Sequence, residues 1–515
     1  MGTAIVSLPG ALAACGAPAA ISPPPGALPG GPPPAAPPAR GRGGAPTYFV
    51  AFGVDTGLLR RVIARGLGRG GDFCEVFLQH RVDHWTGLED GEVNRAYTEV
   101  ALGAGIRVLK GDAQGYAFCE ELTEKALLAA AGTAAAVADG TPTLEPKAFA
   151  AHSVKSAYAV KVPWTEIGVD RKLPLIRRID TVARQADSRI VKVRAGLQDE
   201  TTHILVADSD GRLVEDDQPM AVLYASCVAE AGGRTEQSGH SASARGGLGF
   251  CTHALIDKLA RDAVEFTVLL FDAAPPPPGE YPVVLAPGLS GILLHEAIGH
   301  GMEADFNRKG ISIYADRIGK RIAPKAVTIV DDGTNPRMRG SINVDDEGAP
   351  TERTVLVENG ILRSYMHDLV SARHYKTRQT GSGRRESFRF PPVPRMRNTY
   401  MLDGPHAPEE VIASVKKGLY AEMFSNGQVH IGAGDFTFYL KHGRMIENGK
   451  LGRYVKDANL IGSGPKVLEK IDMVGSDLRM HSGAGYCGKD GQRIPVGFGL
   501  PTIRCGGVSV GGRKA

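Results

Sequence analysis

The chain has 515 residues, of which 43% are hydrophobic and 23% are charged, as in an ordinary soluble globular protein. Because this length exceeds one average domain, we expect two domains with separate cores. The formal net charge of +4 is small for this size and no run of 18 apolar residues occurs, which argues against a nucleic-acid partner and against a membrane-spanning helix.

The seven cysteines are scattered along the chain, odd in number and never spaced as a CxxC pair. This pattern predicts no disulfide framework and is typical of a reducing compartment, so we expect a cytoplasmic protein. The cysteines are Cys15, Cys74, Cys119, Cys227, Cys251, Cys487 and Cys505.

The first 46 residues stand apart because Pro, Ala and Gly dominate between Gly16 and Ala45. A segment of this composition buries too little apolar surface to offset the entropy lost on ordering, so residues 1–46 are predicted to be a disordered tail. The stretch Leu12–Cys15 resembles a lipoprotein cleavage site, but no Lys or Arg precedes it. A lipoprotein signal or a misplaced start is the alternative interpretation of this tail.

Residues 47–273 alternate between helical and extended patterns and are predicted to form an N-terminal α+β domain. Apolar residues recur at helical spacing over 53–68, 123–138, 173–186 and 252–271. Short apolar runs predict strands at 74–80, 93–102, 106–109, 116–119, 190–197 and 203–207. We therefore expect an antiparallel sheet with helices packed against it.

Four consecutive prolines, Pro275–Pro278, predict a linker over residues 274–280, because proline continues neither a helix nor a strand ladder. Residues 281–515 are then expected to form a mainly β C-terminal domain that carries the helix of the metal site. Its β-branched runs, such as Val355–Val357, lie between turn signals. The turn signals are Asp331-Asp332-Gly333, Asp346-Glu347-Gly348, Asn359-Gly360, Asn426-Gly427 and Asn448-Gly449.

The strongest chemical signal is the sequence from His295 to His300, His-Glu-Ala-Ile-Gly-His, which follows a predicted strand at 281–286 and lies on a predicted helix. Imidazole is a good neutral ligand for zinc, and a carboxylate beside it, here Glu296, can take a proton from an activated water. The sequence thus predicts a zinc site with His295 and His300 as ligands and Glu296 as the catalytic base. The alternative is a pair of unrelated histidines on a core helix.

The two histidines are five residues apart, which separates them by about 140° around a regular helix. Both can reach one ion only if the helix is distorted. A π-bulge, with one extra residue in a turn, returns positions i and i+5 to the same face. We expect this distortion at Ile298–Gly299, where glycine tolerates unusual backbone angles.

A third ligand must come from elsewhere, and the local sequence offers Glu303 and Cys487, although Cys487 could equally be a buried loop cysteine without a ligand role. Glu303 follows three residues after His300, whereas Cys487 lies in a glycine-rich loop near Lys489, whose charge would favour a thiolate. Glu303 or His481 could also act as a fourth protein ligand, which would close the site.

Around these residues the sequence resembles the TldD/PmbA metallopeptidase family, specifically its metal-binding TldD branch. The resemblance is strong over about residues 280–512 and diffuse over 48–270, and it does not cover the tail. It rests on the segments His295–Gly310, Asp345–Pro350, Thr380–Arg385, Pro394–Tyr400, Leu460–Pro465 and Cys487–Gln492.

The resemblance implies zinc bound by His295, His300 and Cys487, with Glu296 as the catalytic base. It also implies peptide or unfolded-protein substrates and a dimer, formed with a metal-less paralogue of the TldE/PmbA type or with a second copy. One departure is Arg397, at a position where the family pattern has Thr.

The arginine-rich segment Arg384–Arg397 admits three interpretations, because it also contains Phe388 and Phe390. Arginines beside aromatic rings can bind nucleic acid, but such surfaces normally carry a wider basic field. Near a metal, an arginine could instead grip a peptide carbonyl or carboxylate, and the plain alternative is a solvated basic loop.

We therefore expect a two-domain α+β protein of the cytoplasm that acts as a zinc-dependent peptidase. The rival hypothesis is a non-catalytic, partner-binding subunit whose metal site is purely structural. Three protein ligands with an open fourth position favour catalysis, whereas a fourth protein ligand favours the structural role.

Overall fold

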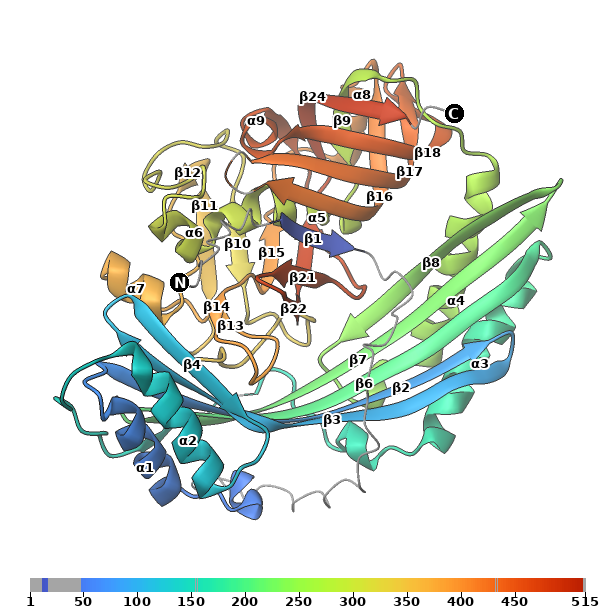
Figure 1. The fold of residues 1–515 in the computed structure, drawn as a ribbon. Coiled ribbons are helices and arrows are strands. Elements are labelled where there is room, and N and C mark those ends of the chain that lie inside the picture. Colours follow the sequence, from blue (N-terminus) through green and yellow to red (C-terminus); the bar gives the residue numbers. More distant parts are fainter. Residues whose placement is uncertain are drawn as a thin grey trace, which may run out of the picture.

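The computed structural model describes residues 12–16, 48–152, 154, 156–430, 432 and 434–512. It has the α+β fold expected from the sequence (Figure 1). Helices cover both ends of a long, curved N-terminal sheet, and the C-terminal strands gather beside that sheet. None of the described helices is long and apolar enough to span a membrane.

The N-terminal sheet has the strand order β4-β3-β2-β6-β7-β5, with β8 also paired to β7. Its neighbouring strands are antiparallel except β5 and β7, which are parallel. The strands are β2 (Phe73–Glu89), β3 (Glu92–Lys110), β4 (Ala113–Cys119), β5 (Ala150–His152), β6 (Ile190–Asp208), β7 (Arg212–Ala231) and β8 (Arg234–Ala244). The helices are α1 (Thr56–Leu67), α2 (Glu124–Ala134), α3 (Val169–Ala186) and α4 (His253–Val268).

Two pairs of helices give this sheet two separate apolar cores. Helices α1 and α2 pack on β2 and β3 around Leu59 and Ile106. Helices α3 and α4 pack on β6 and β7 around Ile176 and Leu223. All four helices follow the apolar patterns seen in the sequence, because one face of each helix is buried against the sheet.

Three of these helices begin at a capping side chain. Asp55, Thr123 and Thr252 each accept a hydrogen bond from the backbone N–H three residues ahead. A cap of this kind satisfies one of the backbone donors that have no partner inside the first turn.

The strands are longer than the sequence pattern predicts. The segments 93–102 and 106–109 belong to one strand, β3, and the segments 190–197 and 203–207 belong to β6. The pattern does not reveal β7 or β8. In β7 the polar residues Asp216 and Gln218 are buried, so they interrupt the apolar run by which a buried strand is recognised.

The C-terminal half consists mainly of strands, as expected. Strand β9 pairs with both β16 and β24, so β9, β16, β17, β18 and β24 close into a ring, and a second sheet has the order β12-β11-β10-β15-β23-β20. The strands are β9 (Gly279–Leu285), β10 (Ile329–Asp332), β11 (Arg353–Glu358), β12 (Ile361–Leu362), β13 (Gly383–Arg384), β14 (Val393–Pro394), β15 (Asn398–Met401), β16 (Lys417–His430), β17 (Asp435–Glu447), β18 (Lys450–Ser463), β19 (Ile471–Val474), β20 (Arg479–Met480), β21 (Tyr486–Lys489), β22 (Gln492–Pro495), β23 (Gly497–Leu500) and β24 (Ile503–Gly512). The helices beyond the metal segment are α6 (Ala304–Arg308), α7 (Leu369–Tyr375), α8 (Pro408–Ala413) and α9 (Gly464–Glu469).

Three of the predicted turns are confirmed by left-handed backbone angles. In Asp346-Glu347-Gly348, Gly348 has a φ of 73° and its N–H donates to the carbonyl of Asp345 at 2.9 Å. Asn359-Gly360 and Asn448-Gly449 have positive φ at both residues, as tight hairpin turns require. The predictions for Asn426-Gly427 and Asp331-Asp332 are wrong, because β16 runs through the first pair and β10 contains the second. In both places neighbouring strands on either side hold the backbone extended, and this pairing outweighs the local turn preference.

Part of the predicted tail has a place in the fold. Residues Leu12–Gly16 form β1, which is antiparallel to residues 426–430 of β16. The rest of residues 1–46 lies outside the described part of the chain. The predicted linker leads into β9 at Gly279, after Ala274 forms an isolated bridge with Val455. The domain division at residues 46, 273 and 280 remains a prediction.

A buried ion network joins the N-terminal sheet to the C-terminal half. The guanidinium of Arg107 on β3 lies 2.7 Å from Glu75 and 2.7 Å from Glu347, and Arg385 lies 2.5 Å from Glu75. Burial by itself raises the pKa of Glu75, but Arg107 and Arg385 outweigh it and lower the pKa below its usual value. Opposite charges thus compensate each other where water is excluded.

Candidate metal centre

Strand β9 leads into a buried helical run whose hydrogen-bonding pattern changes along its length. The 3₁₀ turn η6 (Leu289–Gly291) is followed by one α-helical turn, α5 (Ile292–Leu294), by the π-helix η7 (His295–Gly299) and by the 3₁₀ turn η8 (His300–Met302). Residues 290–302 are all buried. The distortion that the five-residue spacing predicts is therefore present, and it is a π-helical turn.

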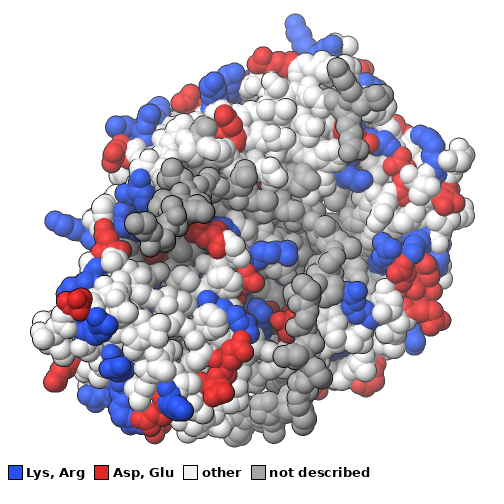
Figure 2. All heavy atoms as spheres, viewed as in Figure 1, with Lys and Arg blue, Asp and Glu red and all other residues white. Residues whose placement is uncertain are grey.

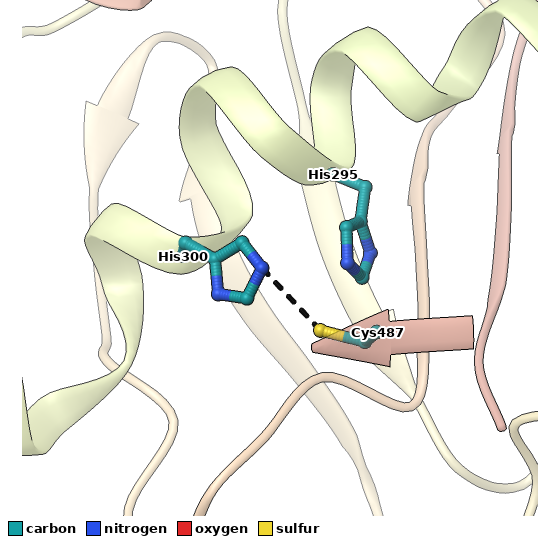
Figure 3. Close-up of side chains that lie close together, drawn as sticks. All are labelled: His295, His300 and Cys487. Atoms are coloured by element: carbon teal, nitrogen blue, oxygen red, sulfur yellow. Dashed lines mark hydrogen bonds between the residues drawn. The ribbon is translucent and has the colours of Figure 1, made fainter. Parts of the chain in front are cut away.

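The wider π turn brings both histidines to one side of the helix. The ring centroids of His295 and His300 are 5.2 Å apart and their planes are inclined by 83°. Figure 3 shows both rings directed toward Cys487, which comes from β21. A straight helix, with the two imidazoles on opposite sides, is excluded.

Three potential metal ligands converge at this point. One ligand atom each of His295, His300 and Cys487 lies within 4.8 Å of the others, and the Sγ atom of Cys487 is 3.3 Å from Nε2 of His300. None of these residues is more than 1% exposed. Two imidazoles and one thiolate form a donor set that suits zinc, and a set of three protein ligands is typical of catalytic sites.

Glu296 lies beside this donor set and not on the far side of the helix. Its side chain is fully buried, and its Oε2 atom is 3.9 Å from Nε2 of His300. A carboxylate at this distance can accept a proton from a water molecule held between the ligands. The arrangement is therefore chemically competent for general-base catalysis.

Glycine at position 299 is explained by close packing. The sequence-based explanation, an unusual backbone conformation, is wrong. The φ of −58° and ψ of −49° at Gly299 are those of an ordinary right-handed helix, so no unusual backbone angle is involved. A Cβ atom at this position would lie 2.1 Å from Sδ of Met396, which is itself fully buried. Glycine is needed here because the segment that carries Met396 presses directly on the π turn.

Glu303 contacts His300 on the ring nitrogen opposite Cys487. Its Oε2 atom is 2.9 Å from Nδ1 of His300, and Lys489 lies 3.2 Å from Glu303 and 2.7 Å from Asp305. Metal-binding histidines usually carry a carboxylate on the nitrogen that does not face the metal. Glu303 thus orients His300, and the charge of Lys489 is matched by two carboxylates.

The surroundings of His300 favour its charged form. Burial lowers its pKa, but the Cys487 thiolate and the Glu303 carboxylate outweigh burial and raise the pKa well above its usual value. Such a concentration of negative charge around an imidazole also attracts a cation.

His481, the other candidate for a fourth ligand, packs against an aromatic ring. It stacks on Phe498 with centroids 5.0 Å apart and planes inclined by 14°, and the Phe498 ring centroid is 6.2 Å from that of His295. Burial lowers the pKa of His481 to about 3. Neither His481 nor Glu303 belongs to the donor set formed by the described residues.

Cys487 lies on a strand of a tight hairpin, although the sequence predicts a loop there. Strands β21 and β22 pair antiparallel across Asp490-Gly491, where both residues have positive φ. Arg395 is fully buried and donates a hydrogen bond of 2.6 Å to the backbone carbonyl of Cys487. The hairpin and this arginine together fix the height of the thiol above the helix.

The arginine-rich segment is neither a solvated loop nor an exposed surface for nucleic acid. Four of its arginines are at most 5% exposed: Arg384, Arg385, Arg395 and Arg397. The exposed Arg389 pairs with Glu120 at 2.6 Å. On the face shown in Figure 2, moreover, Lys and Arg are interspersed with Asp and Glu.

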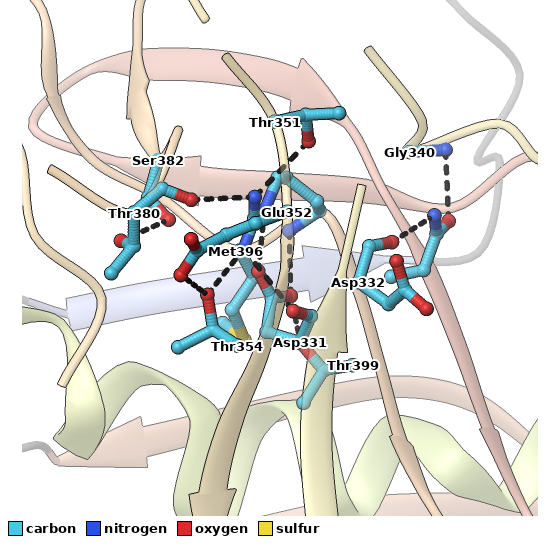
Figure 4. A network of polar contacts seen from close by, with 12 residues as sticks. Asp331, Asp332, Gly340, Thr351, Glu352, Thr354, Thr380, Ser382, Met396 and Thr399 are labelled. Atoms are coloured by element: carbon cyan, nitrogen blue, oxygen red, sulfur yellow. Dashed lines mark hydrogen bonds and ion pairs between the residues drawn. The ribbon is translucent and has the colours of Figure 1, made fainter. Parts of the chain in front are cut away.

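Arg397, which the resemblance singles out as a departure, contacts residues of a buried polar network; Figure 4 labels its partners Asp331, Thr351, Thr354 and Thr380. Its Nε atom lies 2.8 Å from Asp331. Its terminal nitrogens donate to the hydroxyls of Thr351 and Thr354 and to the backbone carbonyl of Thr380. The buried guanidinium is thus satisfied by a carboxylate and neutral acceptors, which explains how an arginine is tolerated here.

Comparison with known proteins identifies the family in which this site occurs. The chain matches PmbA/TldA metallopeptidase domain 1 over residues 74–138, the central domain over 162–271 and the C-terminal domain over 278–512. These matches cover most of the sequence. The chain therefore belongs to the PmbA/TldD metallopeptidase family.

Individual relatives agree with this assignment. The metalloprotease TldD homolog of Buchnera aphidicola is 38% identical over 448 residues, which is 86% of this chain and 93% of the relative. The zinc metalloprotease TldD homolog of Saccharolobus solfataricus is 35% identical over 238 residues, 46% of this chain and 53% of the relative. The crystal structure of TldE from Thermococcus kodakarensis shares the fold, with a TM-score of 0.69 and 19% identity over 88% of this chain and 100% of that one.

Proposed function

We propose that this chain is a zinc-dependent peptidase in which His295, His300 and Cys487 bind the metal and Glu296 is the general base. The observation that carries this proposal is the π turn, which aims two histidines five residues apart at one buried thiol. The name of the S. solfataricus relative, a zinc metalloprotease, supports zinc as the metal.

In the proposed mechanism, each group of the site has a separate role in hydrolysis. A bound zinc ion supplies Lewis-acid chemistry, polarising a carbonyl and making water more acidic. Glu296 accepts the proton of the attacking water and passes it to the leaving amine, while Glu303 keeps His300 in its orientation. The donor set is at most 1% exposed, which argues against a folded protein as the substrate and supports an extended peptide or an unfolded segment.

The Glu296→Gln variant tests this assignment. Glutamine keeps the shape of the side chain but cannot take a proton, so hydrolysis of an unstructured reporter peptide should fall by about 10²–10⁴-fold. Zinc content, measured by mass spectrometry after dialysis, should stay at the wild-type value. Glu145→Gln is the matched control, since Glu145 is exposed. Wild-type rates in Glu296→Gln would remove Glu296 from the role of base.

The same measurements address the rival function. A non-catalytic subunit with a structural metal would retain zinc in both proteins and would show no hydrolysis in the wild type. Loss of zinc should then reduce the free energy of unfolding without any effect on peptide turnover.

We also propose that the protein acts in the cytoplasm as a dimer, with a second copy or with a metal-less paralogue of the TldE type. The fold shared with T. kodakarensis TldE supports such an assembly. The free thiols of six described cysteines support a reducing compartment. The native mass of the complex isolated from its own cells would distinguish the two kinds of dimer.

A further inference from the structure

Arg339 is a buried arginine without a carboxylate partner. It is 3% exposed, and no described residue forms an ion pair with it. Its Nε atom donates a hydrogen bond of 2.9 Å to the carbonyl of Gly485, and its Cζ atom lies 4.3 Å from the ring centroid of Tyr486. Its Nη1 atom is buried and has no hydrogen-bond partner among the described residues. Buried polar atoms are normally hydrogen-bonded, so this guanidinium has capacity for a further acceptor.

Other buried arginines have a carboxylate close by. Arg107 lies 2.7 Å from a glutamate, and Arg397 lies 2.8 Å from an aspartate. Burial raises the pKa of Asp216 and the charge of Arg245 opposes this rise, so Arg245 also lies near a carboxylate. Because a buried charge without a partner is costly, the charge of Arg339 favours the arrival of an anion from outside the chain.

Arg339 lies beside the strand that carries the thiol ligand. It comes from the loop between β10 and β11. Gly485, which accepts its hydrogen bond, precedes Cys487 by two residues, a span of roughly 7 Å in an extended chain. The side chain of Tyr486 between them is partly exposed, so the ring that the guanidinium contacts can be reached from solvent.

A second path of contacts also leads from Arg339 to the metal centre. Burial, and then the charges of His240 and Arg339, lower the pKa of His481 to about 3, so the guanidinium lies near this imidazole. His481 stacks on Phe498, whose ring centroid is 6.2 Å from that of His295. Arg339 thus belongs to the surroundings of the donor set, at a distance that a short extended peptide can span.

We propose that Arg339 binds a carboxylate of the substrate about two or three residues from the bond that is cut. The carboxylate belongs either to the C-terminus of the peptide or to an Asp or Glu side chain, which offer the guanidinium the same chemistry. The carbonyl of Gly485 and the ring of Tyr486 hold the guanidinium in place before the substrate arrives. The inference rests on the proposed peptidase function and names a substrate class for it.

A set of matched peptides tests this inference. All share one unstructured sequence without acidic residues. One peptide ends in a carboxylate, one ends in an amide, and a series of amides carries a single glutamate at successive positions. Because a hydrogen bond to a charged group is stronger than one between neutral groups, the wild type should prefer a carboxylate by about 10–100-fold in kcat/KM over the plain amide. Preference for the free acid identifies the C-terminus, and preference for one glutamate position identifies a side chain.

Substitution of Arg339 should remove this preference. Arg339→Gln loses the charge but can still donate to the carbonyl of Gly485, so cleavage of the carboxylate peptides should fall to the level of the plain amide. Arg339→Lys keeps the charge without the planar fork and should retain part of the preference. Arg493→Gln is the matched control, because Arg493 lies 4.7 Å from the same Tyr486 ring but is exposed. This control should prefer carboxylates as the wild type does.

Binding of the same peptides, labelled for fluorescence anisotropy, is measured in the Glu296→Gln background, so this inference and the peptidase can fail separately. A preference that depends on Arg339 in binding, with no hydrolysis by the wild type, would refute the peptidase and support the carboxylate site. The inference is overturned if the wild type treats all the peptides alike, or if Arg339→Gln weakens every peptide by the same factor, as a purely structural role predicts. Loss of the preference in Arg493→Gln would also overturn it. Circular dichroism and zinc content show whether each variant is folded, and if Arg339→Gln is not, the wild type and Arg339→Lys decide.

Discussion

The Cys487 thiol provides the only sulfur in the proposed donor set, and its loss should weaken the binding of a soft metal ion. In the Cys487→Ser variant a hydroxyl replaces the thiolate, and a hydroxyl is a poor zinc ligand. Because loss of a group that only orients a metal ligand costs about 10–100-fold in metal affinity, loss of a ligand itself should cost at least about 100-fold. Competition with a chromogenic zinc chelator measures this affinity.

Cys505 offers a matched control for this experiment. It is also buried in the C-terminal half, where its Sγ atom contacts the carbonyl of Val283, so serine can keep the same hydrogen bond. Cys505→Ser should bind zinc as the wild type does, and circular dichroism should show both variants folded. Unchanged affinity in Cys487→Ser would contradict the ligand assignment.

Individual site residues can be predicted from the sequence only where they lie close together in the chain. The histidines and Glu296 can be recognised because they lie within six residues. Glu303 stays a candidate ligand, and Cys487 fits a ligand and a buried loop cysteine equally well, until the fold places both. Glu303 then lies on Nδ1 of His300 and not beside Cys487. The role of Arg397 likewise cannot be predicted from the sequence, because its partner Asp331 is 66 residues away in the chain.

Among the elements, the π turn is the one on which the site depends most directly. Valine at position 299 has no room beside the buried Met396, so Gly299→Val should lower the free energy of unfolding by about 1–3 kcal/mol through overpacking. It should also weaken zinc binding without altering a ligand, because His295 and His300 are displaced relative to each other. Chemical denaturation and chelator competition measure the two effects.

A second substitution separates packing from backbone strain. Met396→Ala removes the atoms that valine would meet, so the double variant Gly299→Val/Met396→Ala should regain much of the lost zinc affinity. Gly249→Val is the control, because no atom lies within 4 Å of a Cβ at residue 249. If the double variant binds zinc no more tightly than Gly299→Val does, the contact with Met396 is not the reason why position 299 requires glycine.

The elements also show where sequence patterns succeed and where they fail. The helices are predictable because each has one buried face and three begin at a cap, as at Thr252. Strand β7 is not predictable, because the polar residues Asp216 and Gln218 are buried in it. They are hydrogen-bonded to each other in a network that forms only in the folded chain. The spacing of His295 and His300 predicts the π turn, but the reason for Gly299 depends on Met396, a neighbour only in space.

In the whole molecule, Asp216 belongs to a polar contact between the two halves. The Tyr158 hydroxyl donates to its carboxylate, and the Asn343 side chain donates to it at 2.8 Å. Burial raises the pKa of Asp216 to about 6, above the value of about 3.9 in an unfolded chain. The folded state therefore holds this proton more tightly than the unfolded state.

The stability that Asp216 contributes is therefore fully present below about pH 4 and is lost as the pH rises through about 6. A shift of this size corresponds to about 3 kcal/mol. The difference in unfolding free energy between the wild type and Asp216→Asn should change by that amount between pH 4 and pH 7, as measured by urea denaturation. Asp139→Asn, at a carboxylate that is 97% exposed, should show no such change. If the difference in unfolding free energy between the wild type and Asp216→Asn is the same at pH 4 and pH 7, the pKa of Asp216 is not raised.

The long separation between the metal ligands has a consequence for biosynthesis. Cys487 follows His300 by 187 residues, and it arrives on a hairpin that forms after nearly all other strands have been made. A ribosome that has released only the first 480 residues thus carries a chain that has His295 and His300 but lacks Cys487. Translation order therefore keeps the proposed metal site incomplete until nearly the whole polypeptide has been made.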